Sequence, residues 1–229
     1  MLRFGIAAFG GGLLARQALG RPLGQPIAAE SVQPGHLGVF DSQGDVGVTP
    51  RAGSVQFDPG SGVYRVWGGG ANIWTRVDAF HFVWRRMSGD MTLEATVRWA
   101  QPLPTTDRKA GVMIRQNLDP GAAYADGVVH GRALTAFQYR ETRGALTESV
   151  RLAAGAPVTL RLERRGHMFR LWAAPAGQPL KALGAARITL RDPVYAGLAV
   201  CAHNAADLEE AIFSEVRIRS APTRKREMG

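Results

Sequence analysis

The sequence predicts an all-β protein built as a two-sheet antiparallel sandwich, and three observations support this fold class. Residues 91–99 alternate between apolar and polar side chains, which is the period of a strand with one buried face. The 28 glycines and 13 prolines are spread along the chain, as short strands joined by tight turns require. Turn residues recur about every 8 to 12 positions, a spacing typical of sandwiches, and no stretch keeps a helical period.

The first expected strands are joined by short turns. Residues 54–57 and 63–67 flank the segment 58–62 (DPGSG), whose proline and glycines supply the backbone angles of a turn. Residues 80–87 are rich in aromatic and β-branched side chains, which favour strands. The turn 88–90 (SGD) then leads into the alternating strand described above.

The rest of the chain continues this pattern. Residues 158–164 and 168–174 form a hairpin around the turn 165–167 (RGH). The segment 205–211 could form one helical turn. The remaining strands are short apolar or alternating runs between turn residues, expected at 110–116, 123–130, 134–140, 187–190, 194–201 and 211–218.

Size and charge narrow the class of protein. The chain has 229 residues, enough for one large sandwich with a closed core. Its net charge of +9 comes mostly from dispersed arginines, which indicates a solvated basic surface. Aromatic residues beside glycines, typical of RNA-reading sheets, are absent, so we expect no nucleic-acid partner. The single cysteine, Cys201, excludes an intramolecular disulfide.

Residues 1–29 differ from the rest and predict a signal peptide. After a positive start at Arg3, residues 4–15 are apolar and uncharged. This run is shorter than the roughly 20 residues that a membrane-spanning helix needs, but it matches the core of a signal peptide. Arg16 and Arg21 do not fit that pattern, so a disordered leader is the alternative.

The expected organisation is therefore a leader, one domain and a short tail. Residues 30–219 form the sandwich, and residues 220–229 form a basic C-terminal tail. No other segment is apolar enough to cross a membrane. We expect a periplasmic or secreted protein.

Nine short motifs between residues 40 and 219 resemble a bacterial family of concanavalin A-like domains. The family carries the descriptive name "regulation of enolase" domain and has no known function. The motifs, in order, are FD (40–41), GDVG (44–47), GGANIW (69–74), DAFHF (78–82), SGD (88–90), KAGVMIR (109–115), YAD (124–126), QYR (138–140) and GLAVCAHN (197–204).

The resemblance implies a concanavalin A-like jelly roll and no established reaction. Proteins of this fold include lectins, sugar-binding modules attached to glycosidases, and glucanases. A functional inference from the fold is an analogy, so the residues themselves must carry it.

Side chains that share a strand face suggest a binding site on the concave sheet. In a strand, residues i and i+2 point to the same side. If the strands are neighbours, polar side chains converge on a groove, with rings nearby that could stack on the apolar face of a sugar. The predicted ligand-binding residues are Arg115, Gln138, Arg140, His203, His81, Trp84 and Trp74. Alternatively, the arginines pair with Glu94, Asp126 or Glu141 on a solvated face.

These residues favour a non-catalytic, exported domain that binds a carbohydrate or another small polar ligand. A glycoside hydrolase or lyase is the first alternative, and it needs two carboxyl groups about 5 to 9.5 Å apart. No expected strand carries two acids on one face, although Glu94 or Asp126 could meet an acid from another strand. The second alternative is a structural domain with a protein partner.

Two further sites rest on weaker patterns. Asp41 and Asp45 lie on either side of Gly44 and could bind calcium, which prefers oxygen ligands in loops. No other cofactor is expected. Cys201 and His203 share a strand face and could form a thiolate and its base, but a buried structural cysteine is favoured.

Overall fold

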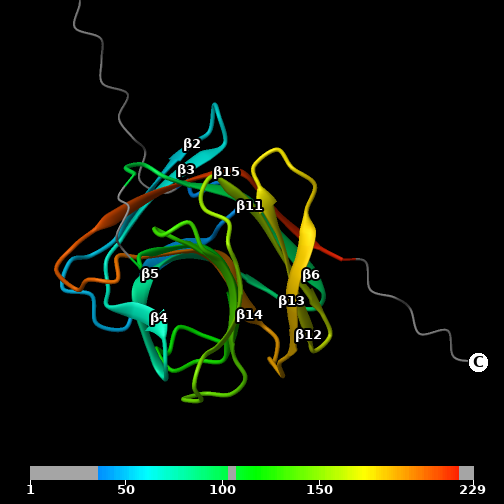
Figure 1. Cartoon of the computed structure of the whole chain (residues 1–229). Coiled ribbons are helices and arrows are strands. Elements are labelled where there is room, and N and C mark those ends of the chain that lie inside the picture. Colours follow the sequence, from blue (N-terminus) through cyan, green and yellow to red (C-terminus); the bar gives the residue numbers. More distant parts are fainter. Residues whose placement is uncertain (1–35, 103–106, 222–229) are drawn as a thin grey trace, which may run out of the picture. The chain divides into compact units, whose positions relative to one another are not determined.

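The computed structural model describes residues 36–102 and 107–221, and all regular structure within them is β (Figure 1). The strands form two antiparallel sheets, which confirms the predicted sandwich. The predicted leader and most of the predicted tail lie outside the described residues. None of the described residues forms a helix of the length and apolarity that a bilayer crossing requires.

The first sheet has eight strands in the order β1-β5-β14-β7-β8-β9-β10, with β4 paired to β5. It brings together segments that are far apart in the sequence. Its strands are β1 (Ser42–Val46), β4 (Asn72–Trp74), β5 (Val77–Met87), β7 (Lys109–Arg115), β8 (Tyr124–His130), β9 (Thr135–Arg140), β10 (Glu148–Leu152) and β14 (Val194–Cys201).

The second sheet has seven strands in the order β13-β12-β11-β6-β15-β3-β2. Its strands are β2 (Ser54–Asp58), β3 (Val63–Gly68), β6 (Met91–Trp99), β11 (Val158–Arg165), β12 (Met168–Pro175), β13 (Lys181–Arg187) and β15 (Glu209–Ser220).

Alternating side chains of the two sheets meet in the main core. In β6, Met91, Leu93, Ala95 and Val97 are fully buried, whereas the residues between them face outwards. The predicted period of 2 is therefore confirmed for this strand.

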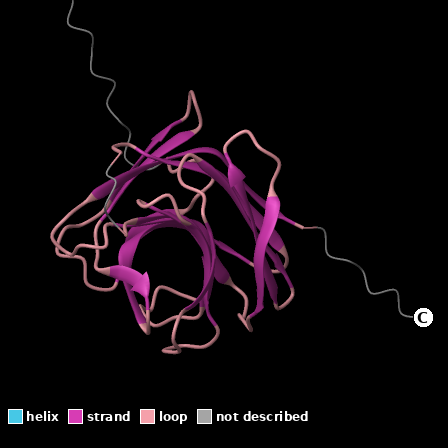
Figure 2. Ribbon diagram, in the orientation of Figure 1, coloured by secondary structure: helices cyan, strands magenta, loops and turns pink. Residues whose placement is uncertain are grey.

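The eight-stranded sheet has a second buried face, directed away from the main core. Figure 2 shows this sheet curling around that face, which we call the inner face. An apolar cluster on this face has members from β1, β4, β5, β14, β7 and β8: Val46, Ile73, Phe80, Phe82, Met113, Tyr124, Ala199 and Cys201. The side chains of β8 and β9 on the same face are largely polar and equally buried.

The sequence pattern misses β1, β4, β10 and β13. β4 is only three residues long, and β10 and β13 are exposed strands at the sheet edges without a buried alternating face. The strand expected at 187–190 is wrong, because β13 ends at Arg187 and the next residues are irregular. The helical turn expected at 205–211 is also wrong, since β15 begins within it at Glu209.

Candidate ligand-binding site

The predicted arrangement of three inner-face side chains is found in the structure. β7, β8 and β9 are successive neighbours, and Arg115, Gln138 and Arg140 all lie on their inner face. All three are buried, with exposed fractions of 0%, 2% and 0%. The two guanidinium groups therefore line no open groove, and their partner is an acid that the sequence pattern did not single out.

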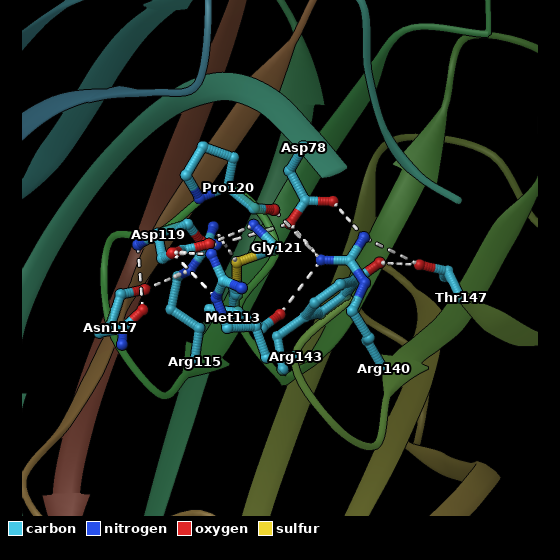
Figure 3. Close-up of polar contacts among 12 residues, drawn as sticks. Asp78, Met113, Arg115, Asn117, Asp119, Pro120, Gly121, Arg140, Arg143 and Thr147 are labelled. Atoms are coloured by element: carbon cyan, nitrogen blue, oxygen red, sulfur yellow. Dashed lines mark hydrogen bonds and ion pairs between the residues drawn. The ribbon is translucent and has the colours of Figure 1, made fainter. Parts of the chain in front are cut away.

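That acid is Asp78, at the start of β5 (Figure 3). Arg140 binds its carboxylate through two nitrogens, with N–O distances of 2.7 and 2.9 Å. Arg115 approaches the same carboxylate at 3.5 Å. All three side chains are fully buried. A two-point arginine contact of this kind is among the stronger charge-assisted hydrogen bonds.

Both arginines also hold loops over the inner face. Arg115 donates hydrogen bonds to the backbone carbonyls of Asn117 (2.7 Å) and Asp119 (2.6 Å). Arg140 donates to the carbonyls of Thr75 (3.2 Å) and Ala122 (3.1 Å). We call Asp78, Arg115 and Arg140 the ion-pair cluster, and in this structure it stabilises the loops that close one end of the inner face.

A row of neighbouring residues crosses the middle of the inner face, one from each strand. Strand register pairs Trp84 of β5 with Gly197 of β14, and Gly197 with Met113 of β7. Met113 in turn pairs with Asp126 of β8, which pairs with Gln138 of β9. We call these five residues the inner-face row. It places an aromatic ring at one end and a carboxyl and an amide group at the other.

The polar end of the row has unused hydrogen-bonding capacity. Asp126 is fully buried, and neither of its carboxyl oxygens has a side-chain partner among the described residues; the backbone N–H of Gln138 is close enough to lower its pKa. The side-chain oxygen of Gln138 is likewise buried without such a partner. Buried polar atoms are nearly always paired, so these atoms call for a specific explanation, such as a role in binding.

Lys109 lies near Asp126 without forming an ion pair with it. Its ammonium group donates a hydrogen bond to the Ile73 carbonyl (2.8 Å) and lies 5.0 Å from the centre of the Trp74 ring. Burial raises the pKa of Asp126 well above its usual value and lowers that of Lys109, although the charge of each partly opposes the shift of the other. Burial thus favours the protonated form of Asp126.

The aromatic end of the row is accessible. Trp84 is partly buried, stacks on Phe82 and meets Tyr195 edge to face, with ring centres 5.6 and 6.1 Å apart. Tyr195 is also partly buried and lies under the guanidinium group of Arg86. Among the predicted aromatic residues, Trp84 is thus placed where a sugar ring could stack on it.

The other predicted residues lie apart from the inner-face row. His81 is buried and hydrogen-bonded through its two ring nitrogens to Asp45 (2.7 Å) and Gln43 (3.0 Å). Trp74 is partly buried in β4 beside Lys109. His203 is exposed just after β14, where its backbone is left-handed (φ 59°), so it does not join the arginines.

The two aspartates proposed for calcium are engaged elsewhere. Asp45 accepts hydrogen bonds from His81 and from the backbone N–H of Gly53 (3.2 Å). Asp41 accepts one from the backbone N–H of Arg86 (3.2 Å). Within residues 36–102 and 107–221, no three histidine, cysteine or acidic side chains gather in a way that could hold a metal ion.

Cys201 has the environment of a structural cysteine. It is fully buried in the apolar cluster of the inner face, and its thiol donates to the carbonyls of Gly70 and Ala79 at 3.4 Å. Burial raises its pKa to about 11, so the thiolate is scarce at neutral pH.

His130, at the end of β8, makes the stability of the domain pH-dependent. Burial and the nearby charge of Lys109 lower its pKa from 6.5 to about 4. Between these values the unfolded chain binds a proton that the folded chain does not, so stability falls as pH falls. Between pH 7 and pH 4 we expect His130→Gln to lose about 3 kcal/mol less stability than the wild type. Urea unfolding at the two pH values measures this difference. The exposed His167→Gln variant should keep the wild-type pH dependence.

Comparison with known proteins rests on structure alone, since the chain matches no protein-family model and no curated protein. A functionally unknown protein from Saccharomyces cerevisiae is similar over 74% of this chain and 92% of its own, with 16% identity and a TM-score of 0.57. The carbohydrate-binding module CBM66 from Bacillus subtilis is similar over 80% of this chain and 98% of its own, with 14% identity and a TM-score of 0.51. The fold is a concanavalin A-like jelly roll.

A larger protein contains the same fold as one part. GH43B of the Bacteroides ovatus xyloglucan PUL is similar over 70% of this chain but only 33% of its own length, with 17% identity and a TM-score of 0.53. At these identities the likeness establishes the jelly roll and leaves activity to be argued from the residues.

Proposed function

We propose that this jelly roll is a non-catalytic, exported carbohydrate-binding domain, and that the inner-face row is its sugar site. Trp84 would stack on the apolar face of a sugar ring. Asp126 and Gln138 would exchange hydrogen bonds with hydroxyl groups at the other end of the row. Membership of the "regulation of enolase" family, which the sequence motifs resemble, is also part of this proposal.

The observation that carries the proposal is the unpaired state of Asp126 and Gln138. A buried carboxyl group without a hydrogen-bond partner costs stability, about 1 to 3 kcal/mol for a typical polar group. Buried carboxyl groups with strongly raised pKa values are common at functional sites, where a ligand can supply hydrogen-bond partners. A protonated carboxyl can both donate and accept, and an amide can do the same, which suits the mixed character of sugar hydroxyls.

The middle of the row is closely packed in this structure. A Cβ atom on Gly197 would lie 1.9 Å from the Val83 carbonyl oxygen, because the neighbouring backbone approaches β14 closely there. Met113 and Asp126 are fully buried. Binding at the polar end of the row therefore requires a local opening of the inner face.

Fold likeness supports the same class of ligand. CBM66, whose name describes it as a carbohydrate-binding module, has 98% of its length covered by the match. The likeness is one of fold, so it supports the class of ligand and does not identify the sugar.

Trp84→Ala tests the proposal. A glycan array first identifies an oligosaccharide that binds the wild-type protein, and isothermal titration then gives its Kd. We expect Trp84→Ala to weaken binding at least tenfold, because a central tryptophan commonly contributes about 2 kcal/mol or more. Trp67→Ala, which removes a partly buried tryptophan from the other sheet, is the matched control. Unchanged affinity in Trp84→Ala, or no glycan bound at all, would refute the proposed site.

Asp126 also favours a second candidate function, a glycoside hydrolase or lyase. A buried carboxyl with a raised pKa is the usual form of a general acid, and Asp78 is a second inner-face acid. However, Asp78 is held by two arginines, which suits it poorly to act as base or nucleophile. Turnover of β-glucans or polyuronates that is lost in Asp126→Asn would favour this enzyme over a binding domain.

Export is part of the proposal and rests on the apolar run at residues 4–15. If residues 1–29 are a signal peptide, N-terminal sequencing of protein recovered from outside the cytoplasm should begin near residue 21 or residue 30. An intact N-terminus on that protein would contradict cleavage.

A further inference from the structure

The outer face of the seven-stranded sheet carries an arginine-rich groove that the proposed sugar site does not use. Its volume is about 440 Å³, within the range of roughly 300 to 1,000 Å³ typical of ligand pockets. It runs over β6, β11 and the end of β15. We call it the outer groove, and it is lined by Thr92, Glu94, Arg161, Glu163, Arg165, Arg217, Arg219, Ser220 and Ala221.

A β-bulge in β15 turns two of the arginines into this groove. Ser214 pairs with Thr96 of β6, but Arg217 pairs with Glu94, so β15 has one extra residue between them. Glu215, inside the bulge, adopts a left-handed backbone conformation (φ 54°) that is uncommon for residues other than glycine. Without the bulge, strict alternation would direct Arg217 and Arg219 towards the core. Bulges that redirect side chains in this way are over-represented near functional sites.

The groove holds its arginines in place and leaves most of their donors free. Glu94 lies between two of them, 2.5 Å from Arg161 and 3.1 Å from Arg217. Each of these arginines uses one nitrogen for Glu94, out of the five N–H donors of a guanidinium group. Their side chains are 39% and 49% exposed, so the free donors face solvent.

The other two arginines extend the positive surface along the groove. Arg165 is fixed by hydrogen bonds to the Met91 carbonyl (3.0 Å) and the Thr92 hydroxyl (3.3 Å). Arg219 is exposed and has no hydrogen-bond or ion-pair partner within the described residues. Four arginines thus face two glutamates, and the groove favours an anion.

We propose that the outer groove binds an acidic carbohydrate, a sugar chain that carries carboxylate or sulfate groups. The planar guanidinium groups match these anions in two-point contacts. Glu94, Glu163, Thr92 and Ser220 offer acceptors and hydroxyls for the neutral parts of the sugar.

Single-stranded nucleic acid fits the groove less well than an acidic sugar. Proteins that bind single strands stack the bases on aromatic side chains. None of the nine residues that line the groove, all of them in the described part of the chain, is aromatic. The proposal concerns a different sheet from the inner-face row, so either site can exist without the other.

The test is binding of defined polymers to the full chain at low ionic strength. Isothermal titration would use polygalacturonate for carboxylates, dextran sulfate for sulfates, neutral dextran, and oligo(dT) as the nucleic acid. We expect one of the acidic polysaccharides to bind, with affinity that falls as salt is added, because exposed charges are screened. The double variant Arg161→Gln/Arg217→Gln should weaken this binding at least tenfold.

A second double variant separates the groove from general basicity. Arg51→Gln/Arg132→Gln removes the same charge from exposed positions outside the groove and should bind like the wild type. If the first double variant does not fold, Arg219→Gln alone, which breaks no ion pair, should still weaken binding about threefold. If Arg161→Gln/Arg217→Gln loses acidic-polysaccharide binding and Trp84→Ala keeps it, the result supports the outer groove as the binding site and not the inner-face row.

Three outcomes would overturn the proposal. The first is that neither acidic polysaccharide binds. The second is that both double variants lose affinity equally, which would indicate attraction by net charge only. The third is that oligo(dT) binds as tightly as the polysaccharide, which would make the groove a nucleic-acid surface.

Discussion

Replacing Asp78 with asparagine is expected to cost the domain about 3 to 5 kcal/mol of folding stability, the usual effect of removing one partner of a buried ion pair. Asp78, Arg115 and Arg140 are all fully buried, so the variant would leave two cations inside the protein without a counter-ion. An amide keeps the shape of the side chain but cannot neutralise the guanidinium groups. Urea unfolding at neutral pH measures the loss, and a marginal domain would not fold at all.

Asp119→Asn is the matched control for this prediction. Asp119 also pairs with an arginine, Arg143 (2.8 Å), but this pair is open to solvent, with exposed fractions of 75% for Arg143 and 32% for Asp119. Exposed pairs contribute about 0 to 1 kcal/mol, so this variant should stay close to the wild type. Equal stabilities of Asp78→Asn and Asp119→Asn would show that the ion-pair cluster does not hold the inner face together.

Asp126→Asn is expected to have the opposite effect on stability. Burial raises the pKa of Asp126 far above its usual value, so the ionised form is poorly tolerated in the folded state. Asparagine has nearly the same shape and no charge. We expect Asp126→Asn to be more stable than the wild type at neutral pH, with a higher Tm. Asp126→Ala, which removes both the donor and the acceptors of this side chain, should weaken glycan binding at least tenfold.

The difference in stability between Asp126→Asn and the wild type should depend on pH. Above about pH 4 the unfolded chain loses the Asp126 proton, whereas the folded chain keeps it, so wild-type stability is lowered as pH rises. The advantage of Asp126→Asn should therefore grow between pH 4 and pH 7. Asp192 provides a control of opposite sign, because hydrogen bonds from Arg164 and Gly89 lower its pKa despite partial burial. An Asp126→Asn variant that is less stable than the wild type at pH 7 would contradict the account.

Strand periodicity predicts which side chains share a face, and on the inner face it predicts some of the site residues but not their partners. The positions of Arg115, Gln138 and Arg140 follow from alternation along β7 and β9. Their partner does not, because Asp78 lies just before the expected strand 80–87, whereas β5 begins at Val77. Lys109 is missed for the same reason, one residue before the expected strand 110–116. Extending both strands by their own alternation would have placed these charges on the inner face.

Other features depend on strand pairing, which a single sequence does not reveal. The inner-face row joins residues from five strands, two of them more than 100 positions apart in the chain. The outer groove depends on the bulge at Glu215, where the alternation of β15 changes phase. Glu94 looks isolated in the sequence and becomes the partner of two arginines only after β6, β11 and β15 are aligned.

The central claim is that the inner-face row binds a sugar, and a crystal structure with a neutral oligosaccharide selected by glycan array tests it most directly. The account predicts a sugar ring stacked on Trp84, with hydroxyl groups hydrogen-bonded to Asp126 and Gln138 through a local opening of the inner face. An oligosaccharide bound at any other surface, with Asp126 and Gln138 still enclosed and unpaired, would contradict it.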